Sequence, residues 1–228
     1  MIRKILTINP DIKEFEHALI GVSLHNSYFK PFILYELIKS AKRNFKSFHV
    51  FLCDTPTVYT FQALGYTKEK SQKKTDRQAR WMKNKIREAL IMAGIEQTDE
   101  YIIDGERLEK NECFKLIYNY YKFLFKNNSY FREICIKTSQ KCYDETLSEF
   151  GGKSHKQFNV EEAAKYIVWE LSLITQSAEI LNVGSSLFCY HKELYFAEHI
   201  FKFYRQFSHL TSERNGFGLE NEIGAPRK

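Results

Sequence analysis

The chain has 228 residues, 43% of them hydrophobic and 15% aromatic, a composition that excludes disorder over most of the length and allows a sizeable core. A formal net charge of +6 is modest, so the distribution of the basic residues matters more than their excess. No apolar run approaches the roughly 20 residues of a membrane span, and the N-terminus lacks the apolar core of a secretory signal. These features predict a cytoplasmic protein without a membrane partner.

The first part of the chain alternates strands with helices. The apolar run HALIGVS (17–23) predicts a buried strand, residues 30–45 predict a helix, and SFHVFLCD (47–54) predicts a second strand. A short helix is expected over 57–65 and a long helix over 68–93, because a glycine closes each of these segments.

The middle of the chain predicts a strand and three helices, in the order EYIID (100–104), 107–127, 130–146 and 160–177. The last of these helices follows Asn159 and has Glu162 three residues later, which is the spacing of a capping box. The segment GGKSHKQFN (151–159) predicts a loop, because its glycines and polar residues break both kinds of periodicity.

The C-terminal part begins with LFCYH (187–191), which predicts a strand, and residues 192–206 predict a final helix. Residues 207–228 are polar and carry three glycines and a proline, so a flexible tail is expected there. Strands that alternate with helices, without an internal repeat or a linker, predict one α/β domain over 1–228 with a largely parallel sheet flanked by helices.

Cysteines and histidines give no sign of a metal site. The five cysteines are an odd number without a C-x-x-C pair, and the seven histidines are scattered along the chain. Reduced thiols are therefore expected, with neither a zinc site nor a disulfide framework. The chain also lacks a glycine-rich loop of the kind that cradles phosphates. We expect neither a metal nor a cofactor.

The segment KKTDRQARWMKNKIR (73–87) concentrates positive charge on a predicted helix. It has seven basic residues and one acidic residue, and at about 100° per residue five of the basic ones form a stripe. These five are Lys73, Arg77, Arg80, Lys83 and Arg87, and the opposite side carries Met82, Ile86, Ala89 and Leu90. A solvated helix face is one interpretation. The near-absence of acidic partners favours the other, a nucleic acid held by its phosphates without sequence readout.

Polar and aromatic side chains follow two of the predicted strands and lie on one predicted helix. Ser23 ends the first strand, and Tyr190 lies near the end of a later one. If the sheet is parallel, both open onto the crevice at the carboxyl ends of the strands. Tyr166 and Glu170 are four residues apart and so share a helix face, where a carboxylate beside a hydroxyl can hold an ammonium group. An ordinary polar contact is the commoner alternative, and the residue patterns leave the chemistry open.

The blocks GVSLHNSYF, YIVWE and SSLFCYH, in this order and separation, resemble the three diagnostic blocks of the cyclodipeptide synthases. The resemblance covers most of the chain and implies a fold similar to the Rossmann catalytic domain of the tyrosyl- and tryptophanyl-tRNA synthetases. It implies that two aminoacyl-tRNAs are the substrates and that the product is a cyclic dipeptide, a diketopiperazine. Asn26, Tyr190 and His191 match the subgroup marked by Asn, Tyr and His or Gln. We expect a monomer.

The resemblance also implies roles for single residues. Ser23 is the nucleophile that accepts the first aminoacyl group as an ester, Tyr166 and Glu170 hold its α-amino group, and Tyr190 lies near the nucleophile. The basic stripe matches the helix that grips tRNA. The expected substrate-binding residues, which include a pocket for the first side chain, are Leu19, Gly21, Asn26, Leu173, Phe188 and His191.

The match is incomplete in one place. Family members often carry a further tyrosine where Phe114 stands in this chain, and Tyr118 or Tyr121 is an alternative for that role. Residues 140–160 have no clear register with the family, so no functional residue is assigned there.

Three other functions compete with cyclodipeptide synthesis. The first is a tRNA-binding module without catalysis, in which Ser23 only caps a helix. The second is a serine hydrolase that uses Ser23 with His25 or His191, although GVSLH is not the G-x-S-x-G turn of such enzymes. The third is an enzyme that transfers the amino acid to some other amine.

Overall fold

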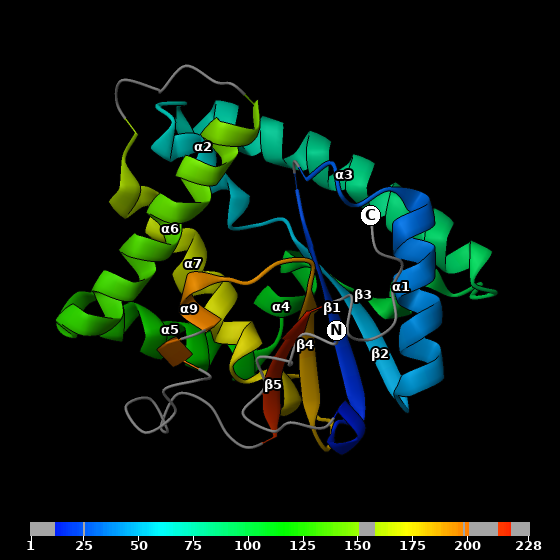
Figure 1. The fold of residues 1–228 in the computed structure, drawn as a ribbon. Coiled ribbons are helices and arrows are strands. Elements are labelled where there is room, and N and C mark those ends of the chain that lie inside the picture. The colour runs from blue at the N-terminus through cyan, green and yellow to red at the C-terminus, as the bar shows by residue number, and fades with distance from the viewer. Residues whose placement is uncertain (1–11, 25, 151–157, 198, 201–213, 220–228) are drawn as a thin grey trace.

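A five-stranded parallel sheet forms the centre of the molecule (Figure 1). The computed structural model describes residues 12–24, 26–150, 158–197, 199–200 and 214–219. The strands run in the order β3-β2-β1-β4-β5, and every neighbouring pair is parallel. They are β1 (His17–Ser23), β2 (Ser47–Cys53), β3 (Ile102–Ile103), β4 (Ser186–Tyr190) and β5 (Asn215–Leu219). The predicted α/β fold with a parallel sheet is confirmed.

Helices connect the strands and cover the sheet. They are α1 (Pro31–Asn44), α2 (Thr57–Ala63), α3 (Lys68–Met92), α4 (Gly105–Glu109), α5 (Glu112–Asn127), α6 (Ser129–Phe150), α7 (Val160–Ile174), α8 (Ser177–Ile180) and α9 (Tyr195–Ala197). Short 3-10 turns occupy Ile12–Glu14 and Thr98–Tyr101. Figure 1 shows α1 on one side of the sheet and α5, α6 and α7 on the other. Among the residues that the structure describes, no helix is long and apolar enough to cross a lipid bilayer.

The register of the strands decides which residues share a face. Gly21 pairs with Phe51, and two residues further on Ser23 pairs with Cys53. Aligned residues of parallel strands point to the same face of the sheet. Phe51 stacks on Trp169 of α7, with ring centroids 6.1 Å apart, so α7 covers the face on which Ser23 lies.

The strand order places a switch point between β1 and β4. From β1 the chain moves outward through β2 and β3, and it then returns to the other side of β1 to form β4 and β5. Connections leave in opposite directions at such a point, and the carboxyl ends of the two strands border a crevice where ligands bind. Ser23 ends β1 and Tyr190 ends β4.

Several predicted boundaries differ from the structure. The strand expected over 100–104 is reduced to Ile102–Ile103, because Thr98–Tyr101 form a 3-10 turn. The helix expected over 107–127 is split by Asn111, whose side chain caps α5 by accepting from the Phe114 amide. The predicted cap of α7 is present, since the Asn159 side chain accepts from the Glu162 amide. The helix expected over 160–177 ends at Ile174 and is followed by α8.

The flexible tail expected over 207–228 is wrong for residues 215–219, which form β5 and pair with β4. The Asn215 side chain accepts from the Ala178 amide, which ties the start of this strand to α8. Gly216 lies against Phe15, because a Cβ added there would be 2.5 Å from Phe15 Cζ. In the helix expected over 192–206, the described part contains α9 (Tyr195–Ala197), and residues 198 and 201–206 lie outside the described residues. The other residues of the expected tail, except Arg214, and most of the loop expected over 151–159 also lie outside them.

Candidate active site

Ser23 stands at the carboxyl end of β1 with two hydrogen-bond donors around its hydroxyl. The Tyr190 hydroxyl donates to Ser23 Oγ at 3.0 Å, and Asn26 Nδ2 lies 3.5 Å from the same oxygen. Ser23 is partly exposed, whereas the rest of β1 is buried. The strand therefore carries one hydroxyl out of the core and into the crevice between β1 and β4.

Asn26 joins the loop after β1 to the end of β4. The Tyr28 amide donates to Asn26 Oδ1 at 2.9 Å, which turns the Nδ2 group toward His191. Nδ2 lies 2.7 Å from Nε2 of His191, and since an amide nitrogen only donates, Nε2 is the acceptor. The Tyr28 ring stacks on the His191 ring with centroids 4.9 Å apart. The three residues of the Asn-Tyr-His pattern, Asn26, Tyr190 and His191, thus lie together beside Ser23.

A buried carboxyl on α7 lies near Tyr190. Glu170 is 6% exposed, and burial raises its pKa to about 7. The neighbouring Cys53 thiol lowers the pKa of this carboxyl and so partly offsets the effect of burial, and Tyr166 lies beside Cys53. Cys53 pairs with Ser23 across β1 and β2, so the thiol lies between Ser23 and the α7 residues Tyr166 and Glu170. Cys53 was not among the predicted site residues, although its position at the end of the second strand was a usable signal.

Tyr190 is a hydrogen-bond donor at this site rather than a base. Burial raises the pKa of its phenol well above the ordinary value, and the nearby Glu170 carboxylate raises it further. The hydrogen bond to Ser23 only partly offsets these effects. The phenol therefore keeps its proton near neutral pH and cannot deprotonate Ser23.

The residues expected to line the first side-chain pocket lie under this site. Leu19 pairs with Phe188 across β1 and β4, and both side chains are fully buried. Leu173 follows Glu170 by three residues on α7 and is also fully buried. A Cβ added at Gly21 would be 2.4 Å from Phe188 Cζ, so the Phe188 ring occupies the space that the glycine leaves.

The two alternatives to the family's further tyrosine make other contacts. Tyr121 is buried, and its hydroxyl lies 2.6 Å from Thr175 Oγ1. Burial raises the pKa of the Tyr118 phenol, and the nearby Tyr59 raises it further. Phe114 packs edge-on against Trp169, with centroids 5.0 Å apart. Phe114 thus packs against α7 and has no hydroxyl to offer at this position.

Gly21→Ala is expected to destabilise the fold by about 1–3 kcal/mol, because the new methyl group would displace a fully buried Phe188 ring. Urea denaturation of the variant and of the wild type measures this difference. A fall in unfolding free energy below about 0.5 kcal/mol would show that Phe188 moves freely, and then the pocket is larger than the contacts of this ring indicate.

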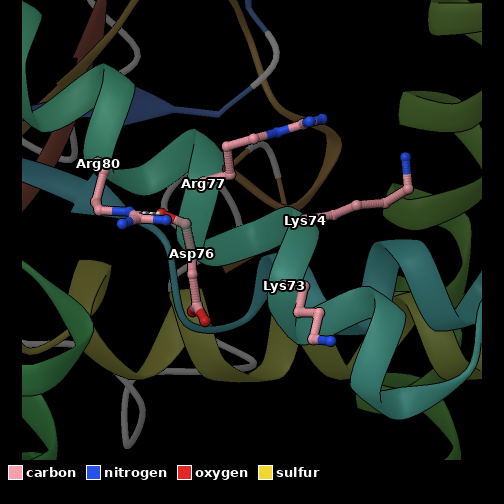
Figure 2. Close-up of a pocket in the computed structure, with 5 residues that line it drawn as sticks. All are labelled: Lys73, Lys74, Asp76, Arg77 and Arg80. Carbon is pink, nitrogen blue, oxygen red and sulfur yellow. Dashed lines mark hydrogen bonds between the residues drawn. The ribbon is translucent and has the colours of Figure 1, made fainter.

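The first half of the basic helix presents its cations to solvent. Lys73, Lys74, Arg77 and Arg80, together with Asp76, line an open hollow of about 420 Å³ on α3 (Figure 2). The Arg80 guanidinium turns back to the Asp76 carbonyl at 3.4 Å. The four residues predicted for the core side of the helix are buried, and Ser71 and Thr75 are buried with them. These four are Met82, Ile86, Ala89 and Leu90.

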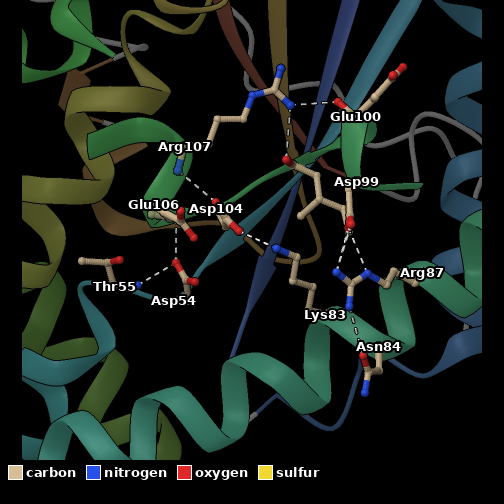
Figure 3. A network of polar contacts seen from close by, with 12 residues as sticks. Asp54, Thr55, Lys83, Asn84, Arg87, Asp99, Glu100, Asp104, Glu106 and Arg107 are labelled. Atoms are coloured by element: carbon tan, nitrogen blue, oxygen red, sulfur yellow. Dashed lines mark hydrogen bonds and ion pairs between the residues drawn. The ribbon is translucent and has the colours of Figure 1, made fainter. Parts of the chain in front are cut away.

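The expectation that all five cations of the stripe lack acidic partners is wrong for the second half of the helix (Figure 3). Lys83 Nζ is 2.7 Å from Asp104 Oδ2, and both side chains are largely buried. Arg87 is 2.9 Å from the carboxylate of Asp99. The sequence argument considered only acidic residues one turn away on the same helix, whereas Asp104 and Asp99 belong to the segments on either side of β3.

Metal ligands do not cluster in the described part of the chain, where no group of three or more His, Cys, Asp or Glu side chains could hold an ion. All five cysteines lie in the described part of the chain, and none of them forms a disulfide bond.

Residues 9–220 match the family model for cyclodipeptide synthases, which is more than half of the chain. The chain belongs to the cyclodipeptide synthase family. Among its curated relatives are a cyclo(L-leucyl-L-leucyl) synthase of Bacillus subtilis, 26% identical over 91% of this chain and 83% of that protein, and a cyclo(L-tyrosyl-L-tyrosyl) synthase of Mycobacterium tuberculosis, 26% identical over 93% and 72%.

Solved structures of cyclodipeptide synthases share the fold. One from Bacillus thermoamylovorans superposes with a TM-score of 0.81 at 22% identity, over 93% of each chain. One from Mycobacterium tuberculosis has a TM-score of 0.72 at 25% identity, over 90% of this chain and 85% of that one. Its description states that these enzymes are related to type I tRNA synthetases.

Proposed function

We propose that this cyclodipeptide synthase joins the aminoacyl groups of two aminoacyl-tRNAs into a cyclic dipeptide through esters on Ser23. The observation that carries the proposal is the hydroxyl of Ser23, partly exposed at the β1–β4 switch point, with Tyr190 and Asn26 as donors. A buried carboxyl on α7 lies near Tyr190. Together these groups supply a nucleophile, donors for a developing oxyanion and an acceptor for an amine.

The first step is an ester exchange. Ser23 Oγ attacks the aminoacyl carbonyl carbon, the new Oγ–C bond forms, and the bond from that carbon to the ribose oxygen breaks. The serine proton ends on the ribose hydroxyl that leaves. One ester replaces another, so the step is close to isoenergetic and needs no ATP. Because Tyr190 keeps its own proton, it serves as a donor to the reacting oxygens, and the ribose oxygen is the final acceptor.

Glu170 is suited to hold the α-amino group and to take its proton. An α-amino group titrates near about 8, close to the pKa of about 7 that burial gives this carboxyl. The carboxylate binds the ammonium form, and a proton moves between groups of similar pKa at little cost. The amine that results is neutral and can attack an ester. Tyr166 lies near this carboxyl and offers a second polar contact for the amine.

The remaining steps exchange esters for amides. The amine of the Ser23-bound residue attacks the carbonyl of a second aminoacyl-tRNA, an amide forms, and the second ribose hydroxyl leaves. The free amine of this dipeptidyl ester then attacks the Ser23 ester carbonyl and closes the ring. Oγ of Ser23 leaves and regains a proton. Both exchanges run downhill, because an amide is more stable than an ester.

Asn26, Tyr190 and His191 support assignment to the Asn-Tyr-His/Gln subgroup, since these three side chains lie together around Ser23. The buried Leu19, Leu173 and Phe188 favour an apolar first residue of modest size. Methylene-scale differences in such a pocket discriminate by only about 1–3 kcal/mol, so several products are expected. The two curated relatives above, named for dileucyl and dityrosyl products, show the range within the family.

The proposed tRNA site is the exposed basic stretch of α3 from Lys73 to Arg80, called here the basic half of α3. Arg77→Ala is expected to weaken tRNA binding at every base sequence and to lower the slope of log affinity against log salt by about 1, because one phosphate contact is lost. Arg87→Ala is the matched control. Its guanidinium already pairs with Asp99, so the slope should stay unchanged. Filter binding across a salt series measures both, and equal slopes for the two variants would move the site away from the hollow in Figure 2.

Two competing functions fit the site less well. A serine hydrolase needs a histidine on Ser23 Oγ, but among the described residues the hydrogen-bond partners of that oxygen are Tyr190 and Asn26. His25, the other candidate, lies outside the described residues. A tRNA-binding module without catalysis has no use for a buried carboxyl beside a serine. Incubation with aminoacyl-tRNAs followed by mass spectrometry tests all of these, because a diketopiperazine, a hydrolysed amino acid, an adduct of another amine and an unchanged substrate differ in mass.

A further inference from the structure

Trp81 is a large aromatic side chain left in solvent on the basic helix. It is 58% exposed, whereas the chain's other tryptophan, Trp169, is 2% exposed and belongs to the core. Residues four apart on a helix are neighbours on its surface, so Trp81 lies between Arg77 and Lys85. Arg77 lines the open hollow in Figure 2. The indole therefore continues the surface of that hollow along α3.

Lys85 connects this indole to the crevice. Its ammonium lies 3.5 Å from the centroid of a Trp81 ring, and it also donates to the carbonyl of Phe29 at 3.4 Å. Phe29 belongs to the loop after β1, and its ring packs edge-on against His191, with centroids 5.4 Å apart. A continuous set of contacts thus runs from the basic half of α3 through Trp81 and Lys85 to the residues around Ser23.

The surroundings of Trp81 identify the kind of partner that it fits. Its neighbours one turn away are Arg77, Gln78, Asn84 and Lys85, whereas the core of a protein-docking patch is apolar and depleted of charged residues. The ammonium of Lys85 near one ring strengthens the attraction of the surface for an anionic ligand with a flat face. Aromatic side chains interleaved with cations are the usual platform for single-stranded nucleic acid, because every base can stack and every phosphate is negative.

We propose that Trp81 stacks on a base in the unpaired 3′ end of a bound aminoacyl-tRNA and so positions the terminal aminoacyl group for Ser23. The inference rests on the proposed function, since it needs a tRNA substrate. Phosphates of the acceptor stem bind the hollow lined by Lys73, Arg77 and Arg80, and the single strand then passes over Trp81 toward Phe29. Stacking does not read sequence, and it therefore suits an end that all tRNAs share.

Trp81→Ala is expected to weaken binding of an intact tRNA about ten-fold, the usual loss for one base–aromatic stack. Trp81→Phe keeps a ring and should bind within about three-fold of the wild type, whereas Trp81→Leu keeps only apolar surface and should bind like Trp81→Ala. Phe123→Ala removes an aromatic side chain of similar exposure from α5 and serves as the control. None of the Trp81 variants should change the salt slope, in contrast to Arg77→Ala.

A tRNA that lacks its unpaired 3′ nucleotides separates stacking from other effects. The wild type should bind this shortened tRNA about as weakly as Trp81→Ala binds the intact one, and the shortening should cost Trp81→Ala little more. Tryptophan fluorescence gives a second readout, since the base should quench the exposed Trp81 in the wild type and no quenching should remain in Trp81→Phe, where only the buried Trp169 emits.

Three results would overturn the inference. The first is that Trp81→Ala binds intact tRNA like the wild type, and the second is that Trp81→Leu does so. The third is that Trp81→Ala changes the oligomeric state in sedimentation, which would make Trp81 a contact with a second copy. If the wild type still makes cyclic dipeptides in any of these cases, only the role of Trp81 fails. If the wild type neither binds tRNA nor forms a product, the proposed function fails with it.

Discussion

Ser23→Ala is expected to lower cyclic dipeptide formation by at least about a thousand-fold, the scale seen when a nucleophile is removed from a covalent mechanism. The variant keeps the donors Tyr190 and Asn26 but has no oxygen to carry the first aminoacyl group. Intact-protein mass spectrometry after incubation with one kind of aminoacyl-tRNA should show an added aminoacyl mass on the wild type and none on Ser23→Ala.

Tyr190→Phe is the matched control for this experiment. It removes only the hydroxyl that donates to Ser23 Oγ, so the aminoacyl adduct should still form, at a rate lowered by about 100-fold or more, as for the loss of one preorganised donor. Product formation by Ser23→Ala at a rate similar to that of Tyr190→Phe would contradict the covalent mechanism. The two amino acids would then have to be joined directly between tRNAs.

Glu170→Gln should make the protein more stable at pH 8 and inactive. Burial raises the pKa of this carboxyl from 4.5 to about 7 in the folded chain. Between these two values the folded state binds more protons than the unfolded state, so the carboxyl lowers stability as pH rises through this window. The full cost, present above about pH 7, is about 3 kcal/mol. A neutral amide of the same shape avoids it.

Urea denaturation at pH 5 and pH 8 measures this effect. The gain in unfolding free energy from Glu170→Gln should be about 3 kcal/mol at pH 8 and below about 1 kcal/mol at pH 5. In the wild type, kcat/KM should fall as pH drops below about 7, because the carboxyl becomes protonated and no longer binds the ammonium of the substrate. An equal gain at both pH values would mean that folding does not raise the pKa of this carboxyl.

The sequence predicted where the main candidate residues lie, because the place of each follows from a local rule. Ser23 and Tyr190 end apolar runs, and parallel strands bring such ends to one edge. Tyr166 and Glu170 share a face through their spacing on one helix. Their roles came from the family resemblance and remain proposals.

The features that the sequence missed depend on partners distant in the chain. Lys83 and Arg87 pair with Asp104 and Asp99, which only the packing of α3 beside β3 brings near. Cys53 gains its place in the site from its register with Ser23. The strand Asn215–Leu219 was not predicted, because Gly216 and Gly218 break the alternation of apolar and polar side chains that is typical of a strand. Its pairing with β4 outweighs the low strand propensity of these glycines.

The short length of exposed charge on α3 bears on how the enzyme selects its building blocks. From Lys73 to Arg80 the helix rises only about 10 Å, which spans about three phosphates of one strand. We expect phosphate contacts of that number, in the proposed tRNA site, to position a tRNA without distinguishing one tRNA body from another. Selection would then fall on the esterified amino acid, and one amino acid carried by tRNAs with different anticodons should give the same product.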